Sequence, residues 1–450
     1  LYDLTGDAKY FETAQYFIDA RANNDFFEEE FKRRDKISFW SKAKEKELNR
    51  WYNQFHLPVR EQKTAVGHAV RAVYMYTAMA DIAGRRNDKE LLNSCKDIWS
   101  NIVDKQMYIT GGIGSTHSGE AFTFDYDLPN DTNYSETCAS IGLMFFAQRM
   151  MKIDSHRTYG DTIERALYNT VLAGMNYEGN RFFYVNPLEL VPETCKGNAE
   201  RNHIKASRQK WFACACCPPN LARTIPRLWE YIYTVSKDTV YTHLFMGNES
   251  VLNLDSGKLE IKQVTNYPQE LTINFEVKST SKKEQTLAIR IPEWSQTFKV
   301  FVNGREEEFP VRKNGFIYIH KTFDCLTDIR LELEDKAYLI QANDKVHYDM
   351  GKVAISRGPL IYCIEEVDNG SKLNQIRIDG ESELVVKKEE IWNGSSPIYG
   401  KGYRIKSFSP DLGLYRPYRK EEEEIIIKAI PYYLWNNRKP GEMKVWISLK

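Results

Sequence analysis

Apolar residues recur every three to four positions from Leu1 to about Val235, which is the spacing of one face of an α-helix. This period predicts that the first half of the chain is all-α. The helices that we expect lie at about residues 7–21, 66–79, 87–106, 134–151, 157–173 and 220–235.

After about Ser236 the apolar period changes to two, which is typical of strands with one buried face. The alternation begins at Val240, and a second series of short strands begins near Lys352. Between Val300-Phe301-Val302 and a charged strand, Asn303-Gly304 predicts a hairpin turn. Short, evenly spaced strands of this kind are typical of β-sandwiches.

The two periods together predict a multidomain α plus β protein. We expect a helical domain over residues 1–236, a β-sandwich over 237–345 and a second β-sandwich over 346–450. A chain of 450 residues is long enough for two or three such domains, and 42% hydrophobic residues can fill their cores.

Composition narrows the kinds of partner. The 62 Lys and Arg residues balance the 62 Asp and Glu residues. The net charge therefore gives no sign of nucleic-acid binding and favours a neutral partner. No run of 18 apolar residues exists, so we expect no membrane span. The chain has eight cysteines, and three of them are clustered. This predicts metal-binding thiolates in a reducing, cytoplasmic compartment rather than a disulfide framework.

The candidate chemistry centres on a cysteine cluster, because three cysteines fall within four positions of Cys214-Ala215-Cys216-Cys217-Pro218-Pro219-Asn220. Zinc prefers thiolates, with histidine or carboxylate completing a tetrahedron. Because proline disfavours the helical region for the preceding residue, we expect Cys217 to be extended or in a turn. A purely structural zinc clip would show the same spacing.

The best candidates for the remaining ligands are Glu136 and Cys138. Asn133 and Glu136 have the spacing of a capping box, which predicts that Glu136 and Cys138 lie in the first turn of a helix. Side chains two positions apart do not share a helix face, so this pair converges only at a helix terminus.

A glycine-rich loop, Thr110 to Glu120, ends in a carboxylate. It lacks the lysine and the strand context of a phosphate-binding loop, which argues against a nucleotide. We expect the glycines to let the backbone turn tightly and to present Glu120 in a cleft. Alone, His68, Glu164 and Tyr184 are unremarkable, and the isolated cysteines are best read as buried thiols (Cys95, Cys195, Cys325 and Cys363).

Seven ordered motifs, and two more near the C-terminus, resemble the β-L-arabinofuranosidases of glycoside hydrolase family 127. They are Gly67-His68-Ala69-Val70-Arg71-Ala72, Thr110-Gly111-Gly112-Ile113-Gly114-Ser115, Gly119-Glu120, Glu136-Thr137-Cys138, Glu164-Arg165-Ala166-Leu167-Tyr168-Asn169, Phe183-Tyr184-Val185-Asn186-Pro187, Cys216-Cys217-Pro218-Pro219-Asn220, Arg357-Gly358-Pro359-Leu360 and Ile430-Pro431-Tyr432-Tyr433. The resemblance therefore spans nearly the whole chain.

The resemblance implies a retaining glycosidase with an (α/α)6-barrel catalytic domain followed by β-sandwiches. It implies that zinc is held by one glutamate and three cysteines, matching Glu136, Cys138, Cys216 and Cys217. It also implies Cys216 as the nucleophile, Glu120 as the acid/base, and His68, Glu164 and Tyr184 as residues that line the sugar pocket. The implied partner is an arabinofuranosyl oligosaccharide or glycoconjugate.

Six or seven helices are fewer than the twelve of an (α/α)6 barrel, and Leu1 is not an initiator methionine. We therefore expect that the native chain begins earlier and that the barrel's first part lies there. A second hypothesis, a non-catalytic, zinc-stabilised carbohydrate-binding protein, stays open beside the enzyme, as do a related glycosidase for another sugar and a homodimer. Glu120 favours the enzyme, since a structural clip needs no carboxylate outside its ligand set.

Overall fold

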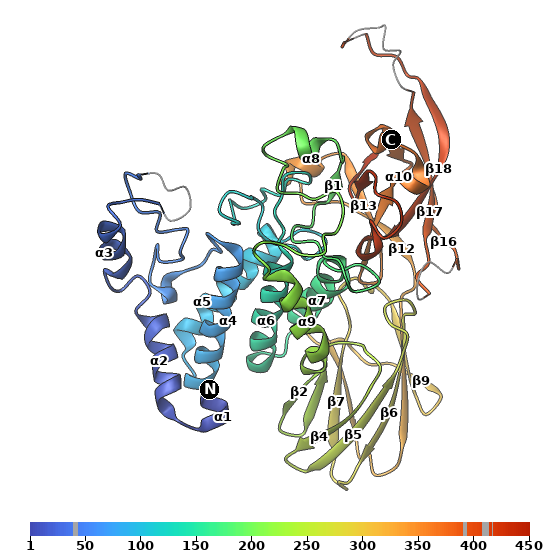
Figure 1. Ribbon diagram of the computed structural model, residues 1–450. Helices are drawn as coiled ribbons and strands as arrows, with labels where there is room; N and C mark the ends of the chain where they lie inside the picture. The colour runs from blue at the N-terminus through green and yellow to red at the C-terminus, as the bar shows by residue number, and fades with distance from the viewer. Residues whose placement is uncertain (39–43, 390–393, 407–413, 416) are drawn as a thin grey trace.

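The computed structural model describes residues 1–38, 44–389, 394–406, 414–415 and 417–450. Helices occupy the N-terminal half, and two β-rich regions follow (Figure 1). In the figure, strands β2 to β9 form the lower region and the C-terminal strands form the upper right. The expected order of one helical part followed by β-rich parts is therefore confirmed.

Two long helices, α4 and α6, form the centre of the helical region, and α5 and α7 pack beside them. Gly142 lets α4 and α6 approach closely, because a Cβ there would lie 2.4 Å from Val73 Cγ2. The helices are α1 (Tyr2–Thr5), α2 (Ala8–Asp19), α3 (Phe26–Arg33), α4 (Ala69–Arg86), α5 (Lys89–Asn101), α6 (Thr137–Ile153), α7 (Arg157–Arg165), α8 (Thr194–Gly197), α9 (Cys217–Thr224) and α10 (Glu366–Asn369).

Helix ends follow local chemistry. The side chain of Asp88 accepts the Leu91 N–H at the start of α5, and Asn87 ends α4 in the left-handed conformation. Shorter helical turns continue several helices or stand between them: Val59–Glu61, Ile102–Gln106, Ala166–Val171, Ile225–Tyr231, His347–Asp349, Leu373–Gln375 and Tyr432–Leu434. With these extensions, all six helices expected from the apolar period are present.

Two local predictions about helix starts were wrong. Cys217 is the first residue of α9 rather than extended, and Cys216, its N-cap, has φ −81° and ψ −39°. Both prolines fall in the first turn, where backbone N–H groups have no helical acceptor, so their missing N–H groups cost little. Asn133 does not cap α6, because its side chain donates to the Asn186 carbonyl instead.

The middle region contains a four-stranded sheet, in the order β10-β7-β3-β2, and a six-stranded sheet, β4-β5-β6-β11-β8-β9, among the residues described. The Asn303-Gly304 hairpin is confirmed: Val302 pairs with Arg305, and both turn residues have positive φ. The strands are β2 (Tyr233–Ser236), β3 (Thr239–Thr242), β4 (Asn248–Leu254), β5 (Gly257–Val264), β6 (Thr272–Ser279), β7 (Gln285–Arg290), β8 (Phe298–Val302), β9 (Arg305–Glu307), β10 (Phe316–Lys321) and β11 (Thr327–Leu333).

The C-terminal region forms one large sheet in the order β1-β19-β14-β18-β17-β15-β20-β13-β12, with β16 paired to β17. Its edge strand β1 comes from the helical half, so the sheet ties the two halves together. The strands are β1 (Glu189–Leu190), β12 (Ala337–Ile340), β13 (Lys352–Arg357), β14 (Leu360–Glu365), β15 (Ile376–Ile378), β16 (Val385–Val386), β17 (Ile398–Ile405), β18 (Glu422–Pro431), β19 (Met443–Lys444) and β20 (Ile447–Leu449).

A buried ion cluster joins α7 to the middle sheets. The guanidinium of Arg290, which is fully buried on β7, lies 2.7 Å from Glu164 and also pairs with Asp161. Trp294 Nε1 donates to the second oxygen of Glu164 at 3.3 Å. Burial raises the pKa of Asp161 to about 6, with Arg290 opposing that rise. The cluster therefore depends on Arg290 for its charge balance.

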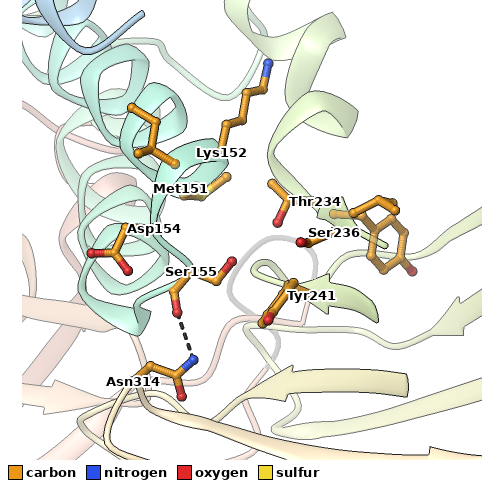
Figure 2. Close-up of a pocket in the computed structure, with 11 residues that line it drawn as sticks. Met151, Lys152, Asp154, Ser155, Thr234, Ser236, Tyr241 and Asn314 are labelled. Atoms are coloured by element: carbon orange, nitrogen blue, oxygen red, sulfur yellow. Dashed lines mark hydrogen bonds between the residues drawn. The ribbon is translucent and has the colours of Figure 1, made fainter. Parts of the chain in front are cut away.

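A cavity of about 620 Å³ lies between the C-terminal end of α6 and the β2–β3 hairpin. Figure 2 shows Ser155 and Asn314 bonded on one side, with Thr234, Ser236 and Tyr241 opposite. None of the candidate site residues named from the sequence lines this cavity. Among the helices described, none is both long and apolar enough to cross a bilayer.

Replacing Arg290 with Met should destabilise the protein by about 3–5 kcal/mol, because it leaves two buried carboxylates without a cation. The expected result is a clear fall in the melting temperature. Arg330→Met is the matched control, since the Arg330–Glu332 pair is half-exposed and contributes about 0–1 kcal/mol. Equal, small shifts for the two variants would show that the buried cluster does not stabilise the domain junction.

Candidate active site

Four predicted ligands converge in the structure. One ligand atom from each of Glu136, Cys138, Cys216 and Cys217 lies within 4.8 Å of the other three. The Cys138 and Cys217 sulfurs are 3.3 Å apart, and Glu136 Oε1 lies 3.3 Å from Cys216 Sγ and 3.6 Å from Cys217 Sγ. We call these four residues the ligand cluster.

The N-termini of two helices position the ligand cluster. Glu136 is the N-cap of α6 in extended conformation, and Cys138 is the second residue of that helix. The change of backbone direction at Glu136 brings its carboxylate beside Cys138, although the two are only two positions apart. Cys216 and Cys217 stand at the start of α9, which packs against α6.

The residues of the ligand cluster fit a divalent cation. Glu136 Oε2 is buried and has no hydrogen-bond partner, so it is available as a metal ligand. A zinc tetrahedron with Zn–S distances of about 2.3 Å has S···S edges of about 3.8 Å. Cys216 and Cys217 have this separation, 3.8 Å, whereas Cys138 and Cys217 are closer.

The pKa shifts within the ligand cluster also favour a bound cation. Hydrogen bonds from Cys138 and then Cys217 lower the pKa of Cys216 far below its ordinary value. Burial raises the pKa of Glu136 and of Cys217, and the nearby Cys216 raises them further. Without a bound cation, ionisation of Glu136 and of Cys217 is therefore opposed. A bound cation would allow the other acidic groups to ionise as well.

Exposure distinguishes the three thiols. Cys138 is 2% exposed and Cys217 is fully buried, whereas Cys216 is exposed. The hydroxyl of Tyr184 lies 2.9 Å from Cys216 Sγ. Tyr184 reaches this position because its carbonyl accepts the Thr137 N–H, which pairs its segment with the start of α6. Of the three sulfurs in the ligand cluster, Cys216 is the one that a substrate can reach.

Glu120 lies outside the ligand cluster and is held by two donors. His68 Nε2 is 3.0 Å from Oε2, and the Tyr134 hydroxyl donates to Oε1 at 2.8 Å. His68 Nδ1 accepts the Arg71 N–H at the start of α4, so the ring proton lies on Nε2, facing Glu120. The hydrogen bond from His68, followed by that from Tyr134, lowers the pKa of Glu120 despite partial burial.

The glycine-rich loop presents Glu120 as the sequence predicted. The loop pairs with the start of α4, because Ala69 N–H donates to the Glu120 carbonyl. Glu120 itself has φ +55° and Gly119 has φ +75°, so the chain turns sharply at the carboxylate. At Gly112 a Cβ would lie 1.8 Å from Ser135 Oγ, so no larger residue fits against the Tyr134–Glu136 segment.

The structure does not bring Glu164 to this site. The carboxylate is 1% exposed and is bonded to Arg290 and Trp294 at the domain junction. A carboxylate engaged in this way supports a structural role rather than contact with a sugar. Sequence reasoning also missed Tyr134 as the second donor to Glu120, because this residue, two positions before Glu136, gave no signal of its own.

Comparisons with known proteins agree in all parts of the chain. The models of one family match in order: the β-L-arabinofuranosidase GH127 catalytic domain over residues 1–230, the GH127 middle domain over 239–334 and the glycoside hydrolase family 127 C-terminal domain over 337–448. A non-reducing end β-L-arabinofuranosidase of Bifidobacterium longum subsp. longum is 36% identical over 465 residues, which covers 99% of this chain and 69% of that protein.

Two solved structures have the same fold. The GH127 β-L-arabinofuranosidase of Geobacillus stearothermophilus has a TM-score of 0.95 at 42% identity, covering 100% of this chain and 71% of that chain. Another GH127 β-arabinofuranosidase has a TM-score of 0.86 at 34% identity, covering 100% of this chain and 67% of that chain. These matches define the class as a glycoside hydrolase. The chain belongs to glycoside hydrolase family 127.

Cys138→Ala should abolish stoichiometric metal binding, because it removes a buried thiolate from the ligand cluster. Elemental analysis of protein purified without chelator should give about one divalent ion per wild-type chain and much less for the variant. Cys95→Ala is the matched control, since Cys95 is equally buried but lies in the core of the helical region. Wild-type protein free of metal, or a variant that keeps it, would contradict the assignment.

Proposed function

We propose that the protein is a retaining β-L-arabinofuranosidase that releases L-arabinose from the non-reducing end of arabinofuranosyl glycans. The observation that carries the proposal is the position of Glu120, a carboxylate held outside the ligand cluster by His68 and Tyr134. A purely structural metal site does not require a carboxylate outside its ligands. The activities named for the family members above support arabinofuranose as the sugar.

We propose zinc as the ion of the ligand cluster, since three thiols and one carboxylate suit it better than a hard cation. When bound, zinc keeps the thiols ionised at neutral pH and stabilises sulfur as a leaving group. The four protein ligands would be Glu136, Cys138, Cys216 and Cys217.

Cys216 is the nucleophile in this proposal, because it is exposed whereas the other two ligand thiols are buried. Its sulfur attacks the anomeric carbon, and the bond from that carbon to the glycosidic oxygen breaks. The Tyr184 hydroxyl, at 2.9 Å, orients the sulfur. His68 and Tyr184 are the proposed sugar-contacting residues, whereas Glu164 is held at the domain junction.

Glu120 is the acid/base of the proposal. In the first step its protonated form gives a proton to the departing oxygen, and in the second step its ionised form takes a proton from water. That water attacks the anomeric carbon and releases Cys216 as a thiolate. The His68 hydrogen bond, which favours the ionised form of Glu120, supports the second step most directly.

The finer architecture is also part of the proposal. We propose that the helical domain is built on an (α/α)6 plan and that each β-rich region is a sandwich, with boundaries near residues 236 and 345. The two sheets of the middle region support this plan. A reducing, cytoplasmic location and a neutral carbohydrate partner remain our proposals. The cluster of free thiols supports the first and the balanced charge supports the second.

Cys216→Ser should reduce kcat/KM for p-nitrophenyl β-L-arabinofuranoside by at least about 10³-fold, since an alkoxide is far more basic than a thiolate and leaves poorly. Cys214→Ser is the control, because Cys214 is an exposed thiol near Tyr184 but is absent from the ligand cluster. A haloacetamide carrying L-arabinose should label Cys216 in mass spectrometry. Label on Cys217, with Cys216→Ser fully active, would reverse the assignment.

Glu120→Gln should lower kcat/KM for an unactivated arabinofuranosyl disaccharide by about 10²–10⁴-fold, because the proton donor is lost. An aryl substrate with a good leaving group needs less protonation, and azide should restore turnover by replacing the activated water. The product should then be β-L-arabinofuranosyl azide with retained configuration. Glu200→Gln, an exposed carboxylate beside His117, should remain active. Equal losses on both substrates without azide rescue would remove Glu120 from the acid/base role.

A further inference from the structure

Three aromatic rings contact one another beside the candidate acid/base. The centroid of the His203 ring lies 4.5 Å from that of His117, at an interplanar angle of 13°, and 5.9 Å from that of Tyr134, at 30°. Aromatic rings attract each other at such distances. The three residues come from the glycine-rich loop, the segment before α6 and the loop between α8 and α9. We call His117, His203 and Tyr134 the ring stack.

Both ends of the ring stack are joined to Glu120. At one end, the Tyr134 hydroxyl donates to Glu120 Oε1 at 2.8 Å. At the other end, the Glu120 N–H donates to the His117 carbonyl at 3.2 Å, so one turn carries both residues. The contacts therefore run in a closed circuit, from Glu120 through the ring stack and back to the same carboxylate. A displacement of the middle ring, His203, would shift the hydroxyl relative to the carboxylate.

His203 is anchored to the chain just before Tyr134. Its Nε2 lies 3.1 Å from the Asn133 carbonyl oxygen and donates to it, because a carbonyl oxygen only accepts. Two positions earlier, Arg201 Nε donates to the Asp131 carboxylate at 2.8 Å. The segment that carries His203 is thus bound at two points to the segment that leads into Tyr134. The His203 ring therefore meets Tyr134 from a fixed position.

The surroundings of His203 favour its neutral form. Nδ1 is buried and has no hydrogen-bond partner among the residues described, so a proton on this atom would have no acceptor. Burial lowers the pKa of His203. The Asn133 carbonyl and Glu200 act against this, whereas His117 and Lys205 add to it. With its single proton on Nε2, the ring keeps its bond to Asn133 and adds no charge to the ring stack.

The hydrogen bond that the ring stack orients acts on the charge of Glu120. A donor to a carboxylate favours its ionised form, and the bond from His68, followed by that from Tyr134, lowers the pKa of Glu120 against partial burial. In the second step of the proposed reaction this carboxylate is ionised and takes a proton from water. The Tyr134 bond therefore extends that step to lower pH. The titratable groups that face Glu120 are His68, Tyr52, Tyr134, Glu136 and Cys216.

We propose that His203 is a positioning residue, which holds the Tyr134 hydroxyl on Glu120 through the ring stack and through its bond to the Asn133 carbonyl. The inference rests on the proposed function. His203 is outside the ligand cluster and acts on the reaction only through Tyr134. Replacing it should therefore have the same kind of effect as removing the Tyr134 hydroxyl, namely a higher pKa of Glu120.

The test follows the pH dependence of kcat for p-nitrophenyl β-L-arabinofuranoside. This substrate has a good leaving group, so hydrolysis of the intermediate on Cys216 limits kcat, and turnover falls as the pH drops through the pKa of Glu120. Tyr134→Phe should move this low-pH limb upward by about one pH unit, because a bond that favours the ionised carboxylate is lost. His203→Ala should move it upward by about half a unit or more.

Two further variants separate positioning from a general loss of structure. The double variant of Tyr134→Phe and His203→Ala should shift the limb no further than Tyr134→Phe alone, because His203 acts through the Tyr134 hydroxyl. His203→Phe keeps an aromatic ring and loses the donor, so it should shift the limb in the same direction by less than His203→Ala. Both His203 variants should keep the bound metal.

His320→Ala is the matched control, because His320 also bonds a hydroxyl, that of Thr286 at 2.8 Å, and stacks on Tyr318, but lies on β10. It should leave the limb unchanged, and Glu120→Gln should remove it. An unshifted limb in both His203 variants, additive shifts in the double variant, or loss of metal would overturn the inference. If wild type turns over no arabinofuranoside, the proposed function fails. If wild type shows the limb and the His203 variants leave it in place, only the inference fails.

Discussion

The structure depends on the convergence of four acidic side chains in one small, mostly buried space. Three thiols and a carboxylate repel one another once they ionise, and burial strengthens that repulsion because little water screens it. The protein holds these groups together by anchoring each pair at the first turn of a helix, α6 or α9, whose N-terminal dipoles favour negative charge. A bound cation would complete this balance.

The packing of the helical region follows from that constraint. Helix α4 contacts α6 along a face where Gly142 removes a side chain, and Tyr74 of α4 accepts a hydrogen bond from Asn220 in α9. The same helix carries His68 at its N-cap, where the ring meets Glu120. One scaffold helix therefore fixes the positions of both the cysteine pair and the candidate acid/base.

The β-rich regions contribute rigidity rather than reactive groups among the residues described. Arg290 from β7 neutralises Asp161 and Glu164 on α7, and β1 joins the C-terminal sheet directly. Glu164 lies in a motif that resembles the family, and its carboxylate faces this junction.

The sequence by itself determined the elements and most of the candidate chemistry. Apolar periods of 3.6 and two are local properties, so the helices, the strands and the Asn303-Gly304 hairpin were predictable, and thiols at Cys216 and Cys217 indicated a metal. Only the tertiary structure decided which thiol is exposed, that Cys217 begins a helix, and that Glu164 meets Arg290. Exposure, the pairing of Tyr134 with Glu120 and the ring stack beside it arise from segments distant in sequence, and no local pattern encodes their approach.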